Sequence, residues 1–264
     1  MKRLTALIPN PKSLIPVVNG LVAAVVAPAC AVCEAVLDAP LSGCVCRICW
    51  AAVRPITPPV CDACGAPLAG RHQSLIPNPQ SLCGWCNGHR SPVTRARAVG
   101  EYDGALRDII HAFKYDGRRS LGKPLAMLMR TRGADLLDLA DCVVPVPLHW
   151  RRQSARGFNQ ARELASHLGP PVIDALVRRR HTRAQVELTA DRRRANVLGA
   201  FCLRRGWLRH PDMHGVKVLL IDDVSTTGAT LESCATVMRT AGASEVCALT
   251  AARAITRRGL SPNP

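Results

Sequence analysis

Short apolar runs bounded by polar turns recur in the second half of the chain and predict buried strands. They cover residues 98–102, 142–147 and 216–221, and only Lys217 interrupts the last of them. Segments with a helical spacing of apolar residues alternate with these runs, at residues 105–114, 121–129, 159–168 and 229–241. Such alternation of strands and helices is typical of an α/β fold.

Two carboxylates, Asp222 and Asp223, follow the apolar run at 216–221 and lead into a hydroxyl-rich turn. The turn and the start of the next helix consist of Val224, Ser225, Thr226, Thr227, Gly228, Ala229 and Thr230. In an open α/β sheet, ligands bind beyond the carboxyl ends of the strands. A loop that enters a helix also offers free N–H groups and the positive end of the helix dipole to a phosphate.

The chemistry of this stretch favours a sugar phosphate. Adjacent carboxylates accept hydrogen bonds from a ribose diol and hold Mg²⁺ directly or through water, and the turn suits a 5-phosphate. The stretch resembles the signature of the type I phosphoribosyltransferases, which bind phosphoribosyl pyrophosphate (PRPP). The alternative interpretation is an ordinary strand-to-helix turn capped by an Asp and a Thr.

A basic segment follows the expected strand at 142–147. Its arginines are Arg151, Arg152 and Arg156, and the segment enters the helix predicted from residue 159. A pyrophosphate carries several negative charges, and guanidinium groups match such oxygens bidentately. We expect residues 148–160 to form a loop that holds a pyrophosphate.

Two other basic segments have competing interpretations. Lys114 begins a turn over residues 114–119 that is either a solvated helix end or a phosphate contact. The arginine-rich residues 178–201 lack apolar periodicity. They form either a charged surface hairpin or a lid that closes over the phosphates.

The charge balance narrows the class of partner. Lys and Arg number 35 against 19 Asp and Glu, a net charge of +16, which favours phosphorylated small molecules, nucleic acid or a membrane surface. Aromatic residues make up only 3% of the chain, so a base-stacking platform is not evident from composition.

Eight of the thirteen cysteines form four C-x-x-C pairs in the first third of the chain. Sequential pairing predicts two structural Zn²⁺ sites, one made by Cys30, Cys33, Cys46 and Cys49 and the other by Cys61, Cys64, Cys83 and Cys86. A single ion, an interleaved arrangement and a redox dithiol are the alternatives. A module this small cannot bury a core of its own, so metal binding is expected to supply most of its folding energy.

The apolar segment at residues 14–29 is either an export signal or a helix packed on the protein. Asn19-Gly20 splits the segment, and Cys30 already belongs to a cysteine pair, which favours the packed helix. The segment is short for a membrane span, so we expect a cytoplasmic protein with no transmembrane anchor. Leu-Ile-Pro-Asn-Pro occurs at residues 7–11 and again at 75–79, where we expect it to lengthen a surface loop.

Several motifs occur in one order after the cysteine pairs. They are Pro145-Val146-Pro147-Leu148, Arg151-Arg152, Arg156-Gly157-Phe158-Asn159-Gln160, Arg180-x-Thr182-x-x-Gln185 with Leu188, Arg193-x-x-Asn196 with Ala200-Phe201, and Ile221-Asp222-Asp223 with Thr226-Thr227-Gly228. With the cysteine pairs, this order resembles the ComF family of ComFC-type proteins associated with competence for natural transformation. The resemblance covers residues 28–255.

The resemblance implies a type I phosphoribosyltransferase-like domain, an open parallel sheet with helices on both faces, joined to a small N-terminal double zinc-ribbon module. The expected divisions are an apolar extension at 1–28, the zinc-ribbon module at 29–94, the phosphoribosyltransferase-like domain at 95–255 and a tail at 256–264.

Two functions compete. An active transferase would bind PRPP with Mg²⁺ and transfer phosphoribosyl to an acceptor that the sequence does not name. A non-catalytic protein would use the same fold to bind single-stranded DNA during uptake, together with proteins of the competence machinery. A PRPP-sensing regulator, the third class, requires a DNA-reading helix that the sequence does not show.

Overall fold

A computed structural model describes residues 27–68, 81–179, 199–204 and 212–255, together with residues 16, 18–20 and 22. The chain divides into two compact units between Ala52 and Val53. The first cysteine cluster belongs to the first unit, and the second cluster shares a unit with the sheet. The domain boundaries expected from the sequence remain predictions.

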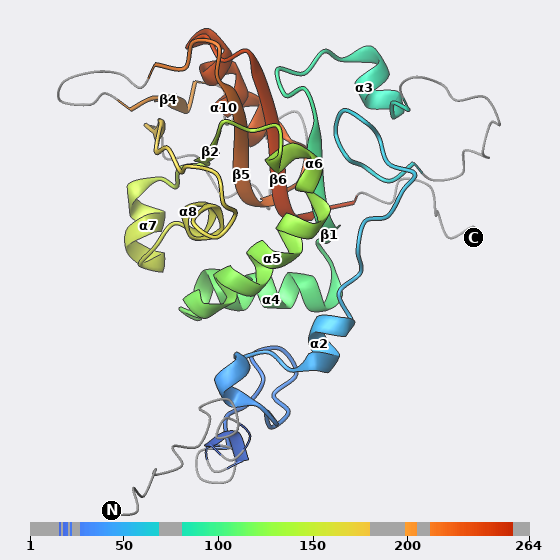
Figure 1. Cartoon of the computed structure of the whole chain (residues 1–264), viewed down its shortest axis with the longest axis vertical. Coiled ribbons are helices and arrows are strands. Elements are labelled where there is room, and N and C mark those ends of the chain that lie inside the picture. The colour runs from blue at the N-terminus through green and yellow to red at the C-terminus, as the bar shows by residue number, and fades with distance from the viewer. Residues whose placement is uncertain are drawn as a thin grey trace, which may run out of the picture. The chain divides into compact units, whose positions relative to one another are not determined.

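A four-stranded parallel sheet forms the centre of the second unit (Figure 1). Its order is β1 (Ala96–Glu101), β6 (Glu245–Arg253), β5 (Lys217–Ser225) and β2 (Cys142–Pro145). The register pairs Ile221 of β5 with Pro145 of β2 and with Leu249 of β6. The carboxyl ends of β2 and β5 therefore lie side by side.

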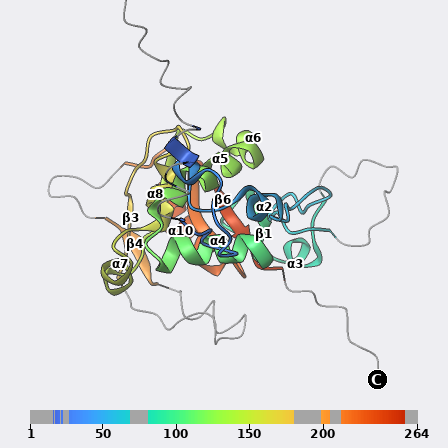
Figure 2. The ribbon, with the colours of Figure 1, turned by 90° about the horizontal axis from the view of Figure 1, so that it is seen from below.

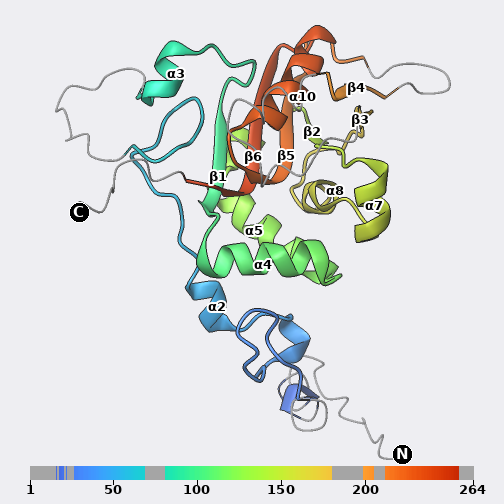
Figure 3. The same ribbon diagram turned by 180° about the vertical axis from the view of Figure 1, so that it is seen from behind.

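Helices cover both faces of this sheet, as expected. The helices α5 (Gly122–Arg132) and α6 (Ala134–Leu137) lie over one face (Figure 1), and α10 (Ala229–Thr240) lies over the other (Figure 3). Alternate strand residues divide between two cores. Val218 and Leu220 of β5 pack with Met238 of α10 in a single buried cluster.

The remaining elements of the second unit flank the sheet. The helices α7 (Trp150–Arg156) and α8 (Gln160–Ala165) and the hairpin of β3 (Leu176–Arg178) and β4 (Phe201–Leu203) lie at the β2 edge, and α3 (Gly84–Gly88) lies toward the β1 edge (Figure 2). The long helix α4 (Gly104–Tyr115) begins at an Asp103 cap. The short helix η2 (Arg119–Leu121) leads into α5.

Sequence patterns locate most of these elements but miss two features. The segment expected as a loop over residues 148–160 contains the helix α7, so that expectation is wrong for residues 150–156. None of the α7 residues is buried, so the helix lacks the apolar periodicity by which the other helices are recognised. The central strand β6 is the second feature, because no apolar run singled out above covers it.

The two cysteine clusters repeat one backbone scheme 31 residues apart. Cys30 N–H donates to the Ala35 carbonyl at 2.8 Å, and Cys61 N–H donates to the Ala66 carbonyl at 2.8 Å. In each cluster the N–H of the third cysteine donates to the sulfur of the first at 3.3 Å. The first unit also holds η1 (Pro40–Ser42) and α2 (Arg47–Ala51).

The second cluster is joined to the sheet by its backbone. Ala96 N–H at the start of β1 donates to the Ala63 carbonyl at 2.7 Å, and an Arg253 guanidinium from the end of β6 donates to the Cys64 carbonyl at 2.8 Å. Gly65 has a positive φ of 68°, and a Cβ there would lie 2.5 Å from the Ala96 carbonyl oxygen. A glycine at position 65 therefore allows the ribbon to contact the strand closely.

Several expectations fall outside the described residues: the lid at 180–198, both Leu-Ile-Pro-Asn-Pro copies, the tail, and most of the N-terminal extension. Within that extension, Asn19 is buried and its side-chain oxygen accepts from Leu41 N–H at 3.0 Å. Across the described ranges, no helix combines the length and the apolar character needed to cross a membrane.

Candidate functional site

The two carboxylates are consecutive residues in the second half of β5, so their side chains point to opposite faces of the strand and have different neighbours. The Asp223 carboxylate lies 2.7 Å from the Lys114 amino group, which comes from the last turn of α4. Asp222 instead interacts electrostatically with Arg178 of β3, as well as with Asp223 and Lys114. The acid pair thus interacts with two cations from different elements, Lys114 of α4 and Arg178 of β3.

Burial and charge shift the pKa values of this group. Burial, followed by the neighbouring Asp223 carboxylate, raises the pKa of Asp222 to about 7, although Lys114 and Arg178 act in the opposite direction. Burial, the largest single cause, lowers the pKa of Lys114, but the charge and hydrogen bond of Asp223 together with the nearby Asp222 and Tyr102 outweigh burial, so the net pKa of this lysine is raised. Lys114 therefore remains protonated and forms a charged pair with Asp223.

The hydroxyl-rich turn follows directly at the end of β5. Gly228 has a φ of +81° and precedes α10, a left-handed conformation that favours glycine. Thr226 and Thr227 are partly exposed, whereas Ala229 is buried at the start of α10 and Thr230 is the second residue of that helix. Ser225 is 6% exposed, and its hydroxyl oxygen has no hydrogen-bond partner among the described residues. A buried hydroxyl without a protein partner is costly unless water or a ligand satisfies it.

The predicted pyrophosphate arginines lie on α7 rather than on a loop. The His149 ring accepts the N–H of Arg151 at the start of this helix. Arg151 lies over the ring of Trp150, with 5.2 Å between its guanidinium carbon and the ring centroid. Arg152 is close enough to Arg178 to lower its pKa further, after burial, which is the main cause. The structure therefore brings Arg152, Arg178 and Asp222 into one electrostatic group.

Arg156, the third predicted arginine, is held by a contact that the sequence does not reveal. Its guanidinium donates to the Tyr115 hydroxyl at 3.0 Å and to the Gln160 side-chain oxygen at 3.1 Å, and lies over the Tyr115 ring. Tyr115 follows Lys114 directly in α4. The acid pair and the arginine helix are thus linked through two consecutive residues.

The Arg-Gly-Phe-Asn-Gln motif has a structural part in the site. The Asn159 side chain accepts Ala161 N–H at 3.0 Å, so it caps α8, and donates to the Val146 carbonyl at 3.1 Å beyond β2. Phe158 packs edge-on against Phe113 of α4. These contacts fix the position of α7 and α8 at the end of the sheet.

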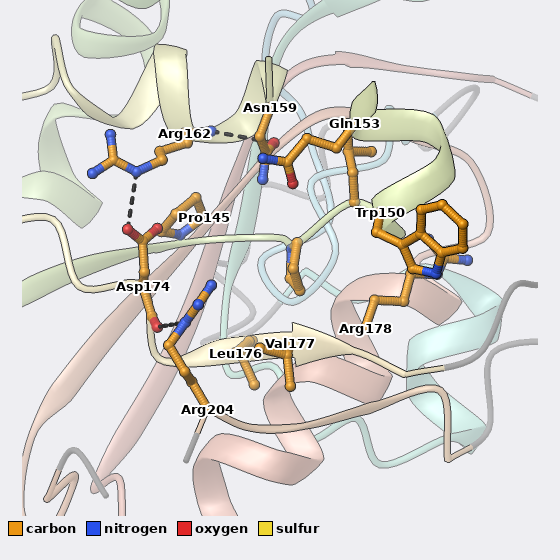
Figure 4. A pocket seen from close by; sticks show the side chains of 12 residues that line it. Pro145, Trp150, Gln153, Asn159, Arg162, Asp174, Leu176, Val177, Arg178 and Arg204 are labelled. Atoms are coloured by element: carbon orange, nitrogen blue, oxygen red, sulfur yellow. Dashed lines mark hydrogen bonds and ion pairs between the residues drawn. The ribbon is translucent and has the colours of Figure 1, made fainter. Parts of the chain in front are cut away.

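A cavity of about 320 Å³ lies beside this group, between α7 and the β3–β4 hairpin (Figure 4). Arg178, Trp150, Gln153 and Asn159 contribute to its wall. Asp174 closes one end, because its carboxylate pairs with Arg162 at 2.9 Å and its carbonyl accepts from Arg204 at 2.9 Å. Arg178 lines the cavity, whereas Asp222 and Asp223 do not. The cavity therefore lies next to the arginine group and is distinct from the predicted sugar site.

The cysteine clusters have the composition of closed structural sites. In each, one sulfur from each of the four cysteines lies within 4.8 Å of the others. The grouping follows the sequential pairing, with Cys30, Cys33, Cys46 and Cys49 in one cluster and Cys61, Cys64, Cys83 and Cys86 in the other. Four thiolates with no open position fit a tetrahedral zinc ion.

Two family models match the chain. Residues 21–87 match the double zinc ribbon domain, and residues 154–261 match the phosphoribosyl transferase domain. The two ribbons and the parallel sheet described above therefore have the fold expected from the sequence.

Individual relatives extend the match to most of the chain. Competence protein F of Haemophilus influenzae is 31% identical over 198 residues, which cover 71% of this chain and 82% of that protein. The chain belongs to the ComF family of competence proteins. The DNA utilization protein YhgH of Salmonella typhimurium is 32% identical and covers 76% of this chain and 87% of its own length. The ComF relative in Bacillus subtilis, competence protein ComFC, is 27% identical over 71% of this chain and 74% of its own.

The sequence does not mark three of the residues that shape the site. Tyr115 and Arg178 lie inside longer basic segments, and Arg253 lies in none of the segments with a candidate function. Each makes its contact through tertiary structure, so no local spacing marks it.

Proposed function

We propose that this ComF protein binds PRPP with Mg²⁺ at the ends of β2 and β5 and transfers its phosphoribosyl group to an acceptor. The single observation that carries the proposal is the convergence of the acid pair, the hydroxyl-rich turn and the arginine group on one edge of the sheet. Because relatives are named for competence and for DNA utilization, we expect the activity to serve such a process.

Each part of the site corresponds to one part of PRPP. The turn from Ser225 to Gly228, with Thr230, would hold the 5-phosphate, supported by the free N–H groups before α10. Asp222 and Asp223 would accept hydrogen bonds from the ribose hydroxyls. Arg151, Arg152 and Arg156 would neutralise the pyrophosphate.

The reaction that fits this arrangement is a displacement at C1 of the ribose. The acceptor forms a bond to C1, the bond between C1 and the pyrophosphate oxygen breaks, and pyrophosphate leaves with the electron pair. The carboxylates would stabilise the positive charge that develops on the ring, and the arginines would stabilise the leaving group. Positioning and fixed charges supply the catalysis, because no covalent protein intermediate is needed.

The donor set at the end of β5 fits Mg²⁺. Carboxylate oxygens are its preferred protein ligands, and it usually keeps several waters and binds substrate phosphates as well. Asp222 would provide the carboxylate contact, because the Asp223 carboxylate already pairs with Lys114. Mg²⁺ would offset the negative charge of the pyrophosphate.

Calorimetry tests the binding step directly. PRPP is titrated into the full chain with and without Mg²⁺, and then into Asp223→Asn, which removes the charge and keeps the shape. Asp138→Asn is the matched control, because Asp138 is exposed beyond α6 and outside the site. Binding by the control, loss of binding by Asp223→Asn and pyrophosphate release with an added acceptor support the proposal. Equal binding by both variants contradicts it.

One observation favours a second function, the binding of single-stranded DNA. Trp150 and Tyr115 are 64% and 58% exposed, and each carries an arginine over its ring. Exposed aromatic rings beside arginines suit the stacking of bases and the neutralisation of phosphates. This pair supplies a stacking surface that the low aromatic content of the sequence does not suggest.

A further inference from the structure

A second cavity, of about 560 Å³, lies between the second cysteine cluster and the hydroxyl-rich turn. Trp85 and His89 line it from the ribbon, and Ser225, Thr226 and Thr227 line it from the turn. Arg253, at the end of β6, contributes to a third side. The function proposed above uses only the turn.

The walls of this cavity are fixed to one another. Arg253 is both a wall residue and the donor to the Cys64 carbonyl, and Ala96 bonds to Ala63 through the backbone. The ribbon and the turn thus share the same sheet as their support. A cavity with rigid walls pre-organises a binding site.

The ribbon side presents a flat aromatic surface. The Trp85 ring stacks on the His89 ring with 3.6 Å between centroids and 12° between planes. The His89 ring nitrogen Nδ1 also lies 3.2 Å from the Trp85 carbonyl oxygen, which holds the pair together. Trp85 remains 45% exposed despite its size. An indole held in this way suits the stacking of a planar ring.

The opposite side presents polar groups that are suited to a ligand. Ser225 lines the cavity and is almost fully buried, and its hydroxyl has no hydrogen-bond partner among the described residues. The hydroxyl-bearing residues Thr226 and Thr227 line the cavity beside it. A ligand that fills the cavity therefore meets an aromatic surface at one end and hydrogen-bonding groups at the other.

We propose that this cavity binds the heterocyclic base of a nucleotide, with the ring against Trp85 and the phosphoribosyl part at the turn. The inference rests on the proposed phosphoribosyl site and names its acceptor class, a nitrogen heterocycle. In the transfer, a ring nitrogen bonds to C1, pyrophosphate leaves with the electron pair of the broken C1–O bond, and the ring N–H proton passes to solvent. The zinc ribbon then recognises the acceptor.

Calorimetry on the full zinc-loaded chain separates the base from the sugar phosphate. The probes are ribose 5-phosphate, AMP, GMP, CMP and UMP. At least one mononucleotide is expected to bind about ten-fold or more tightly than ribose 5-phosphate, since stacking of a base on an aromatic ring typically has this effect. Trp85→Ala should reduce the affinity for that mononucleotide to the affinity for ribose 5-phosphate. Trp85→Phe, which keeps an aromatic ring, should preserve the difference between the two affinities.

Two further variants make the experiment decisive. Trp50→Ala, which removes a partly buried indole beside the first cysteine cluster and outside this cavity, should keep the difference between mononucleotide and ribose 5-phosphate. Ser91→Trp, which fills the cavity from an exposed position, should abolish the difference even if Trp85→Ala loses zinc. Zinc content and circular dichroism establish that each variant is folded.

The outcomes distinguish this inference from the proposed function. If ribose 5-phosphate binds but no mononucleotide binds more tightly, or if Trp85→Ala and Ser91→Trp leave the difference unchanged, the base site is overturned and the phosphoribosyl site stands. If neither PRPP nor ribose 5-phosphate binds, the proposed function fails. A mononucleotide whose binding still depends on Trp85 would then support the cavity alone.

Discussion

The amino group of Lys114 lies 2.7 Å from the carboxylate of Asp223, and the two side chains are only 12% and 10% exposed. The pair connects the end of α4 to the end of β5. Removal of one partner of a buried pair leaves the other charge uncompensated, which commonly destabilises a protein by about 3–5 kcal/mol. The pair therefore matters for folding as well as for any ligand.

We predict that Asp223→Ala abolishes PRPP binding and leaves binding of single-stranded DNA largely intact, because the exposed Trp150 and Arg151 of α7 do not contact this carboxylate. Titration calorimetry with PRPP and fluorescence anisotropy with a labelled DNA strand measure the two affinities. Equal loss of both would mean that the two ligands share one site.

A matched variant separates the loss of the ligand contact from the loss of stability. In the double variant Asp223→Asn with Lys114→Met, no charge is left unpaired, so we expect its unfolding free energy to exceed that of Asp223→Ala. PRPP binding should remain absent. Recovery of PRPP binding along with stability would show that Asp223 acts only through folding.

The raised pKa of Asp222 predicts that PRPP–Mg²⁺ affinity depends on pH. A charged carboxylate is needed for a diol or a metal, so affinity should increase as the pH rises through about 7. Calorimetry between pH 6 and pH 8, corrected for buffer protonation, measures this dependence; the pH values are about one unit either side of that pKa. Asp222→Asn should bind weakly and without this slope.

The same shift affects stability with the opposite sign. The pKa of Asp222 is about 7 in the folded chain and is expected to be near the ordinary carboxyl value of 3.8 in the unfolded chain. Between pH values near 4 and about 7 the folded state therefore binds more protons than the unfolded state, and the unfolding free energy falls as the pH rises. Urea titrations across this window should show the fall in the native chain and a smaller one in Asp222→Asn.

Metal analysis is expected to give about two zinc ions per chain. Cys33→Ser and Cys86→Ser, one from each cluster, should each reduce the content to about one ion. Because residues of the second cluster and of the hydroxyl-rich turn line the same cavity, Cys86→Ser should weaken mononucleotide binding, and Cys33→Ser in the other unit serves as the control that should not. One ion in the native chain would contradict the sequential pairing.

Tyr115 is expected to position Arg156 for pyrophosphate. Tyr115→Leu removes both the ring and the hydroxyl that hold this guanidinium, so PRPP should bind about ten-fold more weakly while ribose 5-phosphate binds as before. Tyr115→Phe, which keeps the ring, should show an intermediate effect. If both ligands weakened together, the role of Tyr115 would be general packing.

Binding of single-stranded DNA, if it uses phosphate contacts, should weaken steeply as salt increases. We expect Trp150→Ala to reduce affinity at every salt concentration and Arg151→Gln to reduce the slope of log affinity against log salt. Anisotropy titrations between low and moderate salt measure both quantities. Affinity that is independent of salt would rule out the phosphate-contact hypothesis.

Local patterns in the sequence predict the parts of this protein whose chemistry is local. The cysteine spacing predicts both clusters, and the apolar run before Asp222 and Asp223 predicts β5 and its turn, because each signal lies within a few consecutive residues. The helix α7 is missed since its residues face outward. The strand β6 is less evident because small residues such as Ala248, Ala251 and Ala252 fill it and both faces are buried.

The contacts that assemble the site could not be predicted in the same way. Lys114 and Tyr115 meet Asp223 and Arg156 only after α4 crosses the ends of the strands, and no periodicity encodes that crossing. Trp85 acquires its significance from a cavity whose other wall is about 140 residues away along the chain.

A substitution of Gly65 would displace the second ribbon from the sheet and leave the ribbon itself folded. Any side chain there would collide with the Ala96 carbonyl, while the four thiolates could still close around their ion. Gly65→Ala would thus yield a chain that retains its metal yet has displaced one wall beside the turn. In such a chain, a normal zinc content would no longer indicate that the neighbouring site can bind its ligand.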